Sequence, residues 1–231
     1  MHIFTAFIWM IWPLFWYGET YLPALFGPAA PFATEATAVV IPASEAADTP
    51  MVLARLGERI QAGEVFTARM QHRFLDGFTQ EEVSSEGQVW VGADSYKIAT
   101  DTQLISVEGR VSTVLNIQPN QLIISQYTPE EDDFAPSRFL GSYQDRFTVS
   151  RVEEEGRFTV VTLVATDPFE LITLARITLD TNSLLPHEMY AEDLNENQFF
   201  ITFEDGALTE AAEDTFRFTW PEAAEIIDLR E

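Results

Sequence analysis

The chain has 231 residues, 46% of them hydrophobic, which suffices for the core of one large domain or two small ones. Its 37 Asp and Glu against 13 Lys and Arg give a formal net charge of −24, which argues against nucleic acid and anionic membrane surfaces as partners, since both require a basic surface. There is no cysteine, which excludes disulfides, cysteine-based metal sites, thiol catalysis and a lipid-modified N-terminal cysteine.

Lys97 is the one lysine among the 13 basic residues. A high acidic content with almost no lysine suggests adaptation to saline surroundings, where salt screens the repulsion between like charges. This hypothesis predicts that the melting temperature rises between low and molar salt.

Residues 3–17 are almost continuously apolar. About 15 residues is short for a membrane span and suits the core of a signal peptide. A cleavage site at 36–38 predicts a signal peptide over 1–38, although 27–30 offers a competing site and no Lys or Arg precedes the apolar core. The alternative is an N-terminal membrane anchor. Residues 39–47 lack periodicity and predict a linker.

Residues 49–62 predict an amphipathic helix, with Thr49 as the N-cap and Pro50 at the first helical position. Residues 65–74 alternate strictly between apolar and polar side chains, which is typical of a strand with one buried face, roughly 30 Å long. Gly63 between them ends the helix.

The rest of the chain predicts short strands joined by short turns, the pattern of an antiparallel meander. After a polar loop at 80–85, the expected strands are 87–91, 96–99, 103–107, 111–116, 121–126, 145–152, 157–165, 171–179, 185–192, 198–203, 215–219 and 225–228. So many strands cannot stay flat, and we expect one large curved antiparallel sheet of the mainly β (α+β) class.

The strand pattern is interrupted by residues 128–133, TPEEDD, and by a short helix within 134–143. The carboxylates could form a calcium loop, but they lack the alternating ligand spacing and the glycine of an EF-hand, so a solvated loop is the better interpretation. Both helices are expected to cover the concave side of the sheet.

No catalytic motif is visible. His72 lies on the apolar face of its strand and His187 in a late strand, and two separated histidines are more often structural than a metal pair. Nucleophile elbows, phosphate-binding glycine loops and HExxH are absent from the sequence. We therefore expect no enzyme and no cofactor. The aromatic residues either fill a core or line a cavity inside the curved sheet.

The order and spacing of these features resemble the LolA-like family of outer-membrane lipoprotein carriers, over residues 48–231. The shared features are the short helix and the long strand 65–74, Gly87-Gln88-Val89-Trp90-Val91, Tyr96-Lys97, Glu108-Gly109-Arg110, Gln121, Phe139-Leu140, and the C-terminal series Phe216, Phe218, Pro221, Ala224, Ile226, Ile227 and Asp228.

Two positions depart from the family pattern. Gly92-Ala93 stands where the family often has Arg-Pro, whose arginine is thought to latch the lid, and Thr113 replaces an aromatic residue. The absence of cysteine favours the soluble carrier over the lipidated receptor that takes lipoproteins from it.

The resemblance implies an incomplete β-barrel with short helices as a plug or lid over an apolar cavity. It implies a monomeric periplasmic carrier that shields lipoprotein acyl chains, receives lipoproteins from an inner-membrane ABC transporter and gives them to an outer-membrane acceptor. The alternative is a periplasmic regulatory or structural module of the same fold that binds a protein partner without lipid.

The candidate lining of the acyl-chain cavity comes from the apolar faces of the helices and early strands. It consists of Leu53, Leu56, Ile60, Phe66, Met70, Phe74, Trp90, Leu122, Ile124, Phe139 and Leu140. Each of these residues could instead be ordinary core, because a one-residue slip in a short strand exchanges its two faces. The first helix is the expected moving part.

Overall fold

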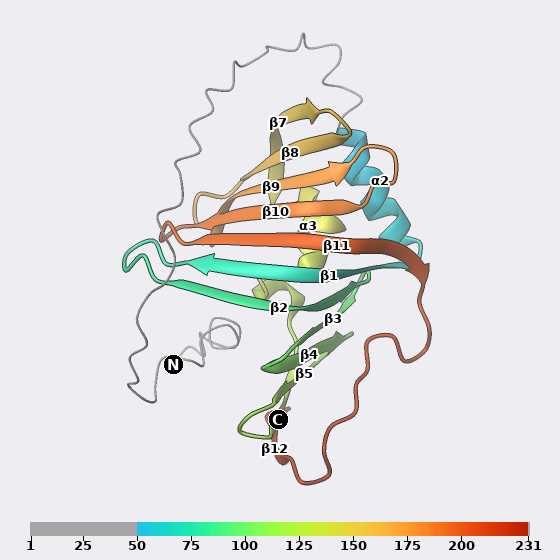
Figure 1. Cartoon of the computed structure of the whole chain (residues 1–231), viewed down its shortest axis with the longest axis vertical. Helices are drawn as coiled ribbons and strands as arrows, with labels where there is room; N and C mark the ends of the chain where they lie inside the picture. Colours follow the sequence, from blue (N-terminus) through green and yellow to red (C-terminus); the bar gives the residue numbers. More distant parts are fainter. Residues whose placement is uncertain (1–49, 231) are drawn as a thin grey trace, which may run out of the picture. The chain divides into compact units, whose positions relative to one another are not determined.

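The computed structural model describes residues 50–230, which form one large sheet with two short helices on one side of it (Figure 1). The elements are α2 (Pro50–Gln61), β1 (Glu64–Leu75), β2 (Glu82–Val91), β3 (Ser95–Thr100), β4 (Gln103–Glu108), β5 (Val111–Asn116), β6 (Gln121–Gln126), α3 (Pro136–Leu140), β7 (Phe147–Glu155), β8 (Phe158–Ala165), β9 (Ile172–Asp180), β10 (Pro186–Asp193), β11 (Gln198–Glu210) and β12 (Glu225–Asp228). The predicted signal peptide, the linker and Thr49 lie outside the described residues.

The 12 strands follow the order β12-β6-β5-β4-β3-β2-β1-β11-β10-β9-β8-β7. All neighbours are antiparallel except β12, which runs parallel to β6. Because β12 and β7 are the two edges and do not pair with each other, the curved sheet is not closed into a barrel. The predicted fold class, a curved incomplete barrel with short helices over its concave face, is confirmed.

α2 and β1 form where the sequence predicts them. Leu53, Leu56 and Ile60 share one helix face and are completely buried. Gly63 follows the helix with a φ of 103°, a left-handed conformation that glycine adopts readily. In β1 the side chains of Phe66 and the alternate residues after it face the helix side, which we call the concave face.

The core lies between this concave face and the two helices. It joins α2 and α3 to the inward side chains of β1, β2 and β8 to β11. Phe66 meets Phe203 of β11 edge to face, with ring centroids 5.5 Å apart, and Phe139 of α3 lies 5.5 Å from Phe147. Of the described residues, no helix is long and apolar enough to span a membrane.

Two strands are longer than the sequence pattern indicated. The predicted polar loop at 80–85 is wrong from Glu82 onward, because β2 begins there and pairs with Leu75 of β1. β11 continues past Phe203 to Glu210 and pairs with the start of β1 across a register shift between Thr67 and Arg69. Neither extension has a fully buried face, so apolar alternation could not reveal it.

The predicted strand at 215–219 is also wrong. Its backbone carbonyls are used by side chains of the sheet: the Lys97 ammonium donates to the carbonyl oxygen of Thr215, and Ser106 Oγ donates to that of Phe216 at 2.6 Å. The segment between β11 and β12 therefore lies against the sheet without joining it. We call residues 211–224 the C-terminal segment.

Candidate functional site

Eight of the eleven predicted lining residues lie together on the concave side. They belong to one buried cluster and come from α2, β1 and α3: Leu53, Leu56, Ile60, Phe66, Met70, Phe74, Phe139 and Leu140. Each is at most 8% exposed. The structure thus brings these residues into one apolar layer between the helices and the sheet, in contact with one another.

The other three residues lie on the opposite, convex face. Trp90 sits between Val89 and Val91, both of which belong to the concave cluster, so its side chain must point the other way. There its indole lies under the Lys97 ammonium, 4.2 Å from the ring centroid. Ile124 of β6 is paired with Thr113 of β5, whose side chain lines the convex groove described below, so Ile124 lies on that face too. Leu122, two residues earlier on the strand, shares this face. The inward placement of Trp90, Leu122 and Ile124 is therefore corrected, because size and apolarity alone did not fix the register.

α2 is held to the rest of the molecule almost entirely by apolar contacts. Among the described residues, its one side-chain ion pair joins Arg59 to Glu64, with Nε 3.0 Å from Oε1, and it connects the helix only to the strand that follows it. A Cβ placed at Gly57 would lie 2.9 Å from the carbonyl oxygen of Gly141, just after α3. The two helices thus approach each other backbone to backbone.

α3, in contrast, is fixed by charged side chains. Asp133 accepts hydrogen bonds from Arg138 at 3.0 Å and from Arg146 at 2.9 Å, and Arg146 also pairs with Glu170 at 2.8 Å. Arg138 is only 12% exposed, so this network is shielded from water. The two helices that cover the core are consequently attached by different physical means.

The acidic loop before α3 is not a solvated loop throughout. Asp132 is 3% exposed, and its Oδ2 accepts hydrogen bonds from the hydroxyls of Tyr96 and Tyr127, both at 2.9 Å. Burial raises the pKa of Asp132 above its usual range, although these hydrogen bonds oppose the shift. Burial next to this carboxylate also raises the pKa values of both tyrosines. The loop is therefore anchored to the sheet.

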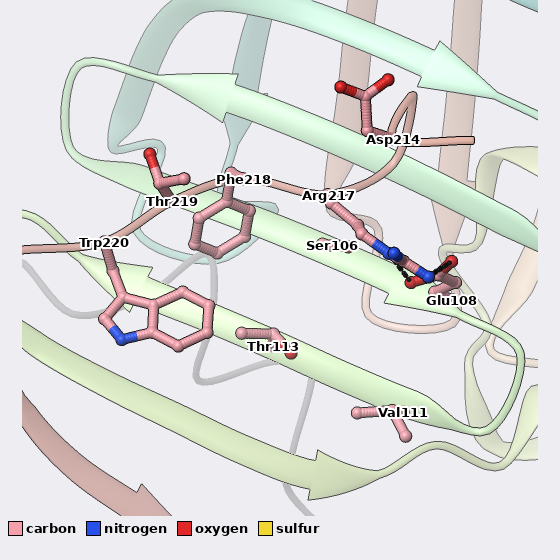
Figure 2. Close-up of a pocket in the computed structure, with 9 residues that line it drawn as sticks. All are labelled: Ser106, Glu108, Val111, Thr113, Asp214, Arg217, Phe218, Thr219 and Trp220. Carbon is pink, nitrogen blue, oxygen red and sulfur yellow. Dashed lines mark hydrogen bonds and ion pairs between the residues drawn. The ribbon is translucent and has the colours of Figure 1, made fainter. Parts of the chain in front are cut away.

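The convex face carries a groove that sequence reasoning missed (Figure 2). Its volume is about 810 Å³, and its walls are the C-terminal segment on one side and the outward side chains of β4 and β5 on the other. The lining residues are Ser106, Glu108, Val111, Thr113, Asp214, Arg217, Phe218, Thr219 and Trp220. The sequence singled out Phe218 but assigned it to a strand.

An ion pair and two aromatic rings mark the two ends of this groove. Arg217 Nε lies 3.1 Å from Glu108 Oε2 at one end, and the rings of Phe218 and Trp220 meet edge to face at the other (Figure 2). Gly92 lies under the neighbouring Phe216, since a Cβ there would be 2.8 Å from the ring. Gly92 is thus in contact with the C-terminal segment.

The two histidines of the described residues lie apart on the sheet. His72 is on β1, where burial lowers its pKa, and His187 of β10 stacks on Phe158 with centroids 4.9 Å apart. In the described part of the chain, no group of three or more Asp, Glu, His or Cys side chains could hold a metal ion.

The sequence matches no family model and no curated protein. Solved structures with a similar arrangement include an uncharacterized conserved protein from Thermus thermophilus, with 10% identity over 75% of this chain and 97% of that one and a TM-score of 0.48. The LolA superfamily protein NE2245 from Nitrosomonas europaea has 12% identity over 74% and 97% of the two chains and a TM-score of 0.41. The MucA/MucB complex of Pseudomonas aeruginosa has 14% identity over 74% and 61% and a TM-score of 0.38. At such low identities and TM-scores, these likenesses concern the arrangement of the strands and helices and not the function.

Proposed function

We propose that the protein is a periplasmic carrier that shields the acyl chains of lipoproteins beneath α2 and moves them from the inner to the outer membrane. The observation that carries this proposal is the unequal attachment of the two helices. α2 covers the apolar concave face through apolar side chains, with the partly exposed Arg59–Glu64 pair as its one charged link among the described residues, whereas α3 is tied down by Asp133, Arg138 and Arg146.

An acyl chain can displace such a helix, because the chain and the buried helix face both offer only apolar surface to the concave face. Leu53, Leu56 and Ile60 contribute only apolar surface, so displacing them breaks no buried hydrogen bond and leaves no charge unpaired. A latch of buried charges would oppose this exchange, and none joins α2 to the sheet among the described residues. The exchange needs no cofactor and no covalent step.

Displacement of the helix also makes release feasible. Burying one methylene is worth ~0.8 kcal/mol, so roughly fifteen on one chain would give on the order of 12 kcal/mol. Several chains would approach the practical ceiling of about 20 kcal/mol for noncovalent binding. Uncovering the concave face costs part of this free energy, which keeps the complex weak enough to deliver its cargo.

The partners of this carrier follow from its chemistry and from the family resemblance. A donor in the inner membrane, for which the resemblance indicates an ABC transporter, would load lipoproteins, and an outer-membrane acceptor would receive them. The protein would work as a monomer, because one sheet with its helix encloses the proposed site.

The second candidate function is a regulatory or structural module that binds a protein partner without lipid. It is favoured by the packing of the concave layer, where Leu53, Leu56, Ile60 and Phe66 are 0% exposed and already in contact with their neighbours. A module of this kind would keep α2 permanently in place.

Acyl-chain binding separates the two functions. The protein should co-purify with lipoprotein or lipid detectable by mass spectrometry, and it should bind a fluorescent fatty acid that a triacylated lipopeptide displaces. Met70→Ala, which removes volume from the concave layer, should change the affinity for the fatty acid, whereas Ile124→Ala on the convex face should leave it unchanged. If no acyl species co-purifies and the fatty acid does not bind, the carrier proposal fails and the partner-binding module is favoured.

A further inference from the structure

Three loops lie side by side at one end of the sheet. They are the β1–β2 loop (76–81), the β8–β9 loop (166–171) and the β10–β11 loop (194–197), and the strand order β2-β1-β11-β10-β9-β8 makes them neighbours (Figure 1). Hydrogen bonds join them: the Gly77 N–H donates to Asn197 Oδ1, and the Leu194 N–H donates to the carbonyl oxygen of Leu171, both at 2.9 Å. We call these loops the rim.

Each loop of the rim presents one large apolar side chain to solvent. Phe78 is 95% exposed, Phe169 is 86% exposed and Leu194 is 50% exposed. The two phenylalanines are the most exposed large apolar residues among those described. Single exposed apolar residues are common, but three on adjoining loops form a patch of the kind that marks an interaction surface.

Hydrogen bonds between aspartate side chains and backbone N–H groups fix the conformation of the three loops. Asp76 Oδ1 accepts hydrogen bonds from the N–H groups of Phe78 at 2.9 Å and Thr79 at 2.6 Å. Asp167 Oδ1 accepts one from the Phe169 N–H at 2.9 Å, and Asp193 Oδ1 accepts one from the Asn195 N–H at 2.8 Å. A preorganised surface loses less conformational entropy when it binds, so the patch is suited to docking.

The charge of the rim identifies the kind of partner. Its loops contain five carboxylates and no lysine or arginine: Asp76, Glu81, Asp167, Glu170 and Glu196. The bordering Arg73 and Arg146 are already paired with Glu82 and Glu170. An anionic bilayer would repel this surface, whereas a surface rich in lysine and arginine would attract it.

We propose that the rim is a docking surface for a protein partner whose apolar pockets, ringed by Lys and Arg side chains, receive Phe78, Phe169 and Leu194. Neighbouring loops are two strands apart, so the three span about 20 Å, which fits within one side of a standard protein interface. The proposal does not depend on whether the concave face carries acyl chains.

Photo-crosslinking with the full chain, in the cells that produce it, tests this surface. p-Benzoylphenylalanine is placed at 78, 169 or 194, or at the control position Leu229, which is 59% exposed and follows β12 at the far edge of the sheet. The three rim positions should yield adducts with the same protein, on peptides next to Lys or Arg residues, and Leu229 should not.

Charge reversal tests the basic nature of the partner. The Glu81 and Glu196 carboxylates make no hydrogen bond or ion pair with other described residues, so Glu81→Lys with Glu196→Lys should leave the fold intact and lower the adduct yield by about tenfold. Binding of the fluorescent fatty acid should not change in this variant. Phospholipid adducts, equal adducts from Leu229, no adducts from the rim, or an unchanged yield after charge reversal would each overturn the proposal.

Discussion

Gly57 of α2 and Gly141 after α3 are in backbone contact, since a Cβ at residue 57 would lie 2.9 Å from the carbonyl oxygen and 3.6 Å from Cα of Gly141. Real Cβ atoms essentially never approach an oxygen so closely. The absence of a side chain at 57 therefore lets the two helices close over the core. Because α3 is held by ion pairs, this contact sets how far α2 can descend toward the sheet.

Gly57→Ala puts two effects in opposition. Intrinsic helix propensity alone predicts a gain of about 1 kcal/mol in the free energy of unfolding. The close contact predicts a loss of about 1–3 kcal/mol, because either α2 or α3 must shift. We expect the free energy of unfolding, measured by urea titration, to fall overall. We also expect faster uptake of the fluorescent fatty acid.

Glu58→Ala is the matched control, because residue 58 is exposed on the same helix. It should change neither the stability by more than about 0.5 kcal/mol nor the uptake rate. A Gly57→Ala variant that is more stable than the wild type would show that the helices accommodate the methyl group and that the contact does not hold α2 in position.

Lys97 ties the C-terminal segment to the convex face. Its ammonium donates to the carbonyl oxygen of Thr215 and lies over the Trp90 ring, and burial lowers its pKa. Lys97→Met keeps the apolar stem and removes the donor. We expect trypsin to cleave after Arg217 about tenfold faster, since local opening becomes easier by about 1.4 kcal/mol.

Arg151→Met serves as the comparison for this measurement, because Arg151 is exposed and pairs only with the nearby Glu153 among described residues. It should leave the cleavage rate at Arg217 unchanged. Equal rates for Lys97→Met and the wild type would mean that Ser106 and the Arg217–Glu108 pair hold the segment without Lys97.

Asp132 gives the folding stability a specific pH dependence. Its pKa is raised in the folded state, so its contribution is fully present at low pH and is lost as the pH rises through that pKa, upward from about pH 4. The stability of the wild type relative to Asp132→Asn should therefore fall as the pH rises above about 4. The other carboxylates contribute equally to the pH dependence of both proteins, so their contributions cancel in this difference.

Tyr96→Phe provides the second arm of the pH experiment. It removes a hydrogen bond that stabilises the ionised Asp132, so it should raise the pKa of Asp132 further and extend the loss of stability to higher pH. Urea titrations at a series of pH values measure both effects. A wild type whose stability stays parallel to that of Asp132→Asn would show that Asp132 titrates as in the unfolded chain.

The sequence was sufficient where one face of an element is buried along its whole length. Phe66, Met70 and Phe74 alternate with polar residues, and Leu53, Leu56 and Ile60 recur at helical spacing, so β1, α2 and the concave layer were predictable. The first residues of β2 (82–86) and the last residues of β11 (204–210) have no such buried face, and they form strands because they pair with β1.

Features that depend on distant partners could not be predicted. Trp90 points outward because Val89 and Val91 face the concave cluster, and the burial of Asp132 depends on tyrosines of β3 and the β6 end. The alternation in 215–219 resembles a strand, yet Ser106 and Lys97 engage its carbonyls instead of a neighbouring strand. The rim was missed because Phe78 and Phe169 lie in turns, where no periodicity exists.

Whether α2 must move for cargo to enter is decided by cross-linking α2 to the fixed α3. One cysteine is placed on α2 and one on α3, away from the Gly57–Gly141 contact, where a Cβ would collide with the Gly141 carbonyl oxygen, and the wild-type chain has no cysteine to compete. The oxidised protein should take up neither fluorescent fatty acid nor lipoprotein, and reduction of the same sample should restore uptake. If the oxidised protein takes up both at the rate of the reduced protein, α2 is a fixed plug and cargo does not enter by displacing it.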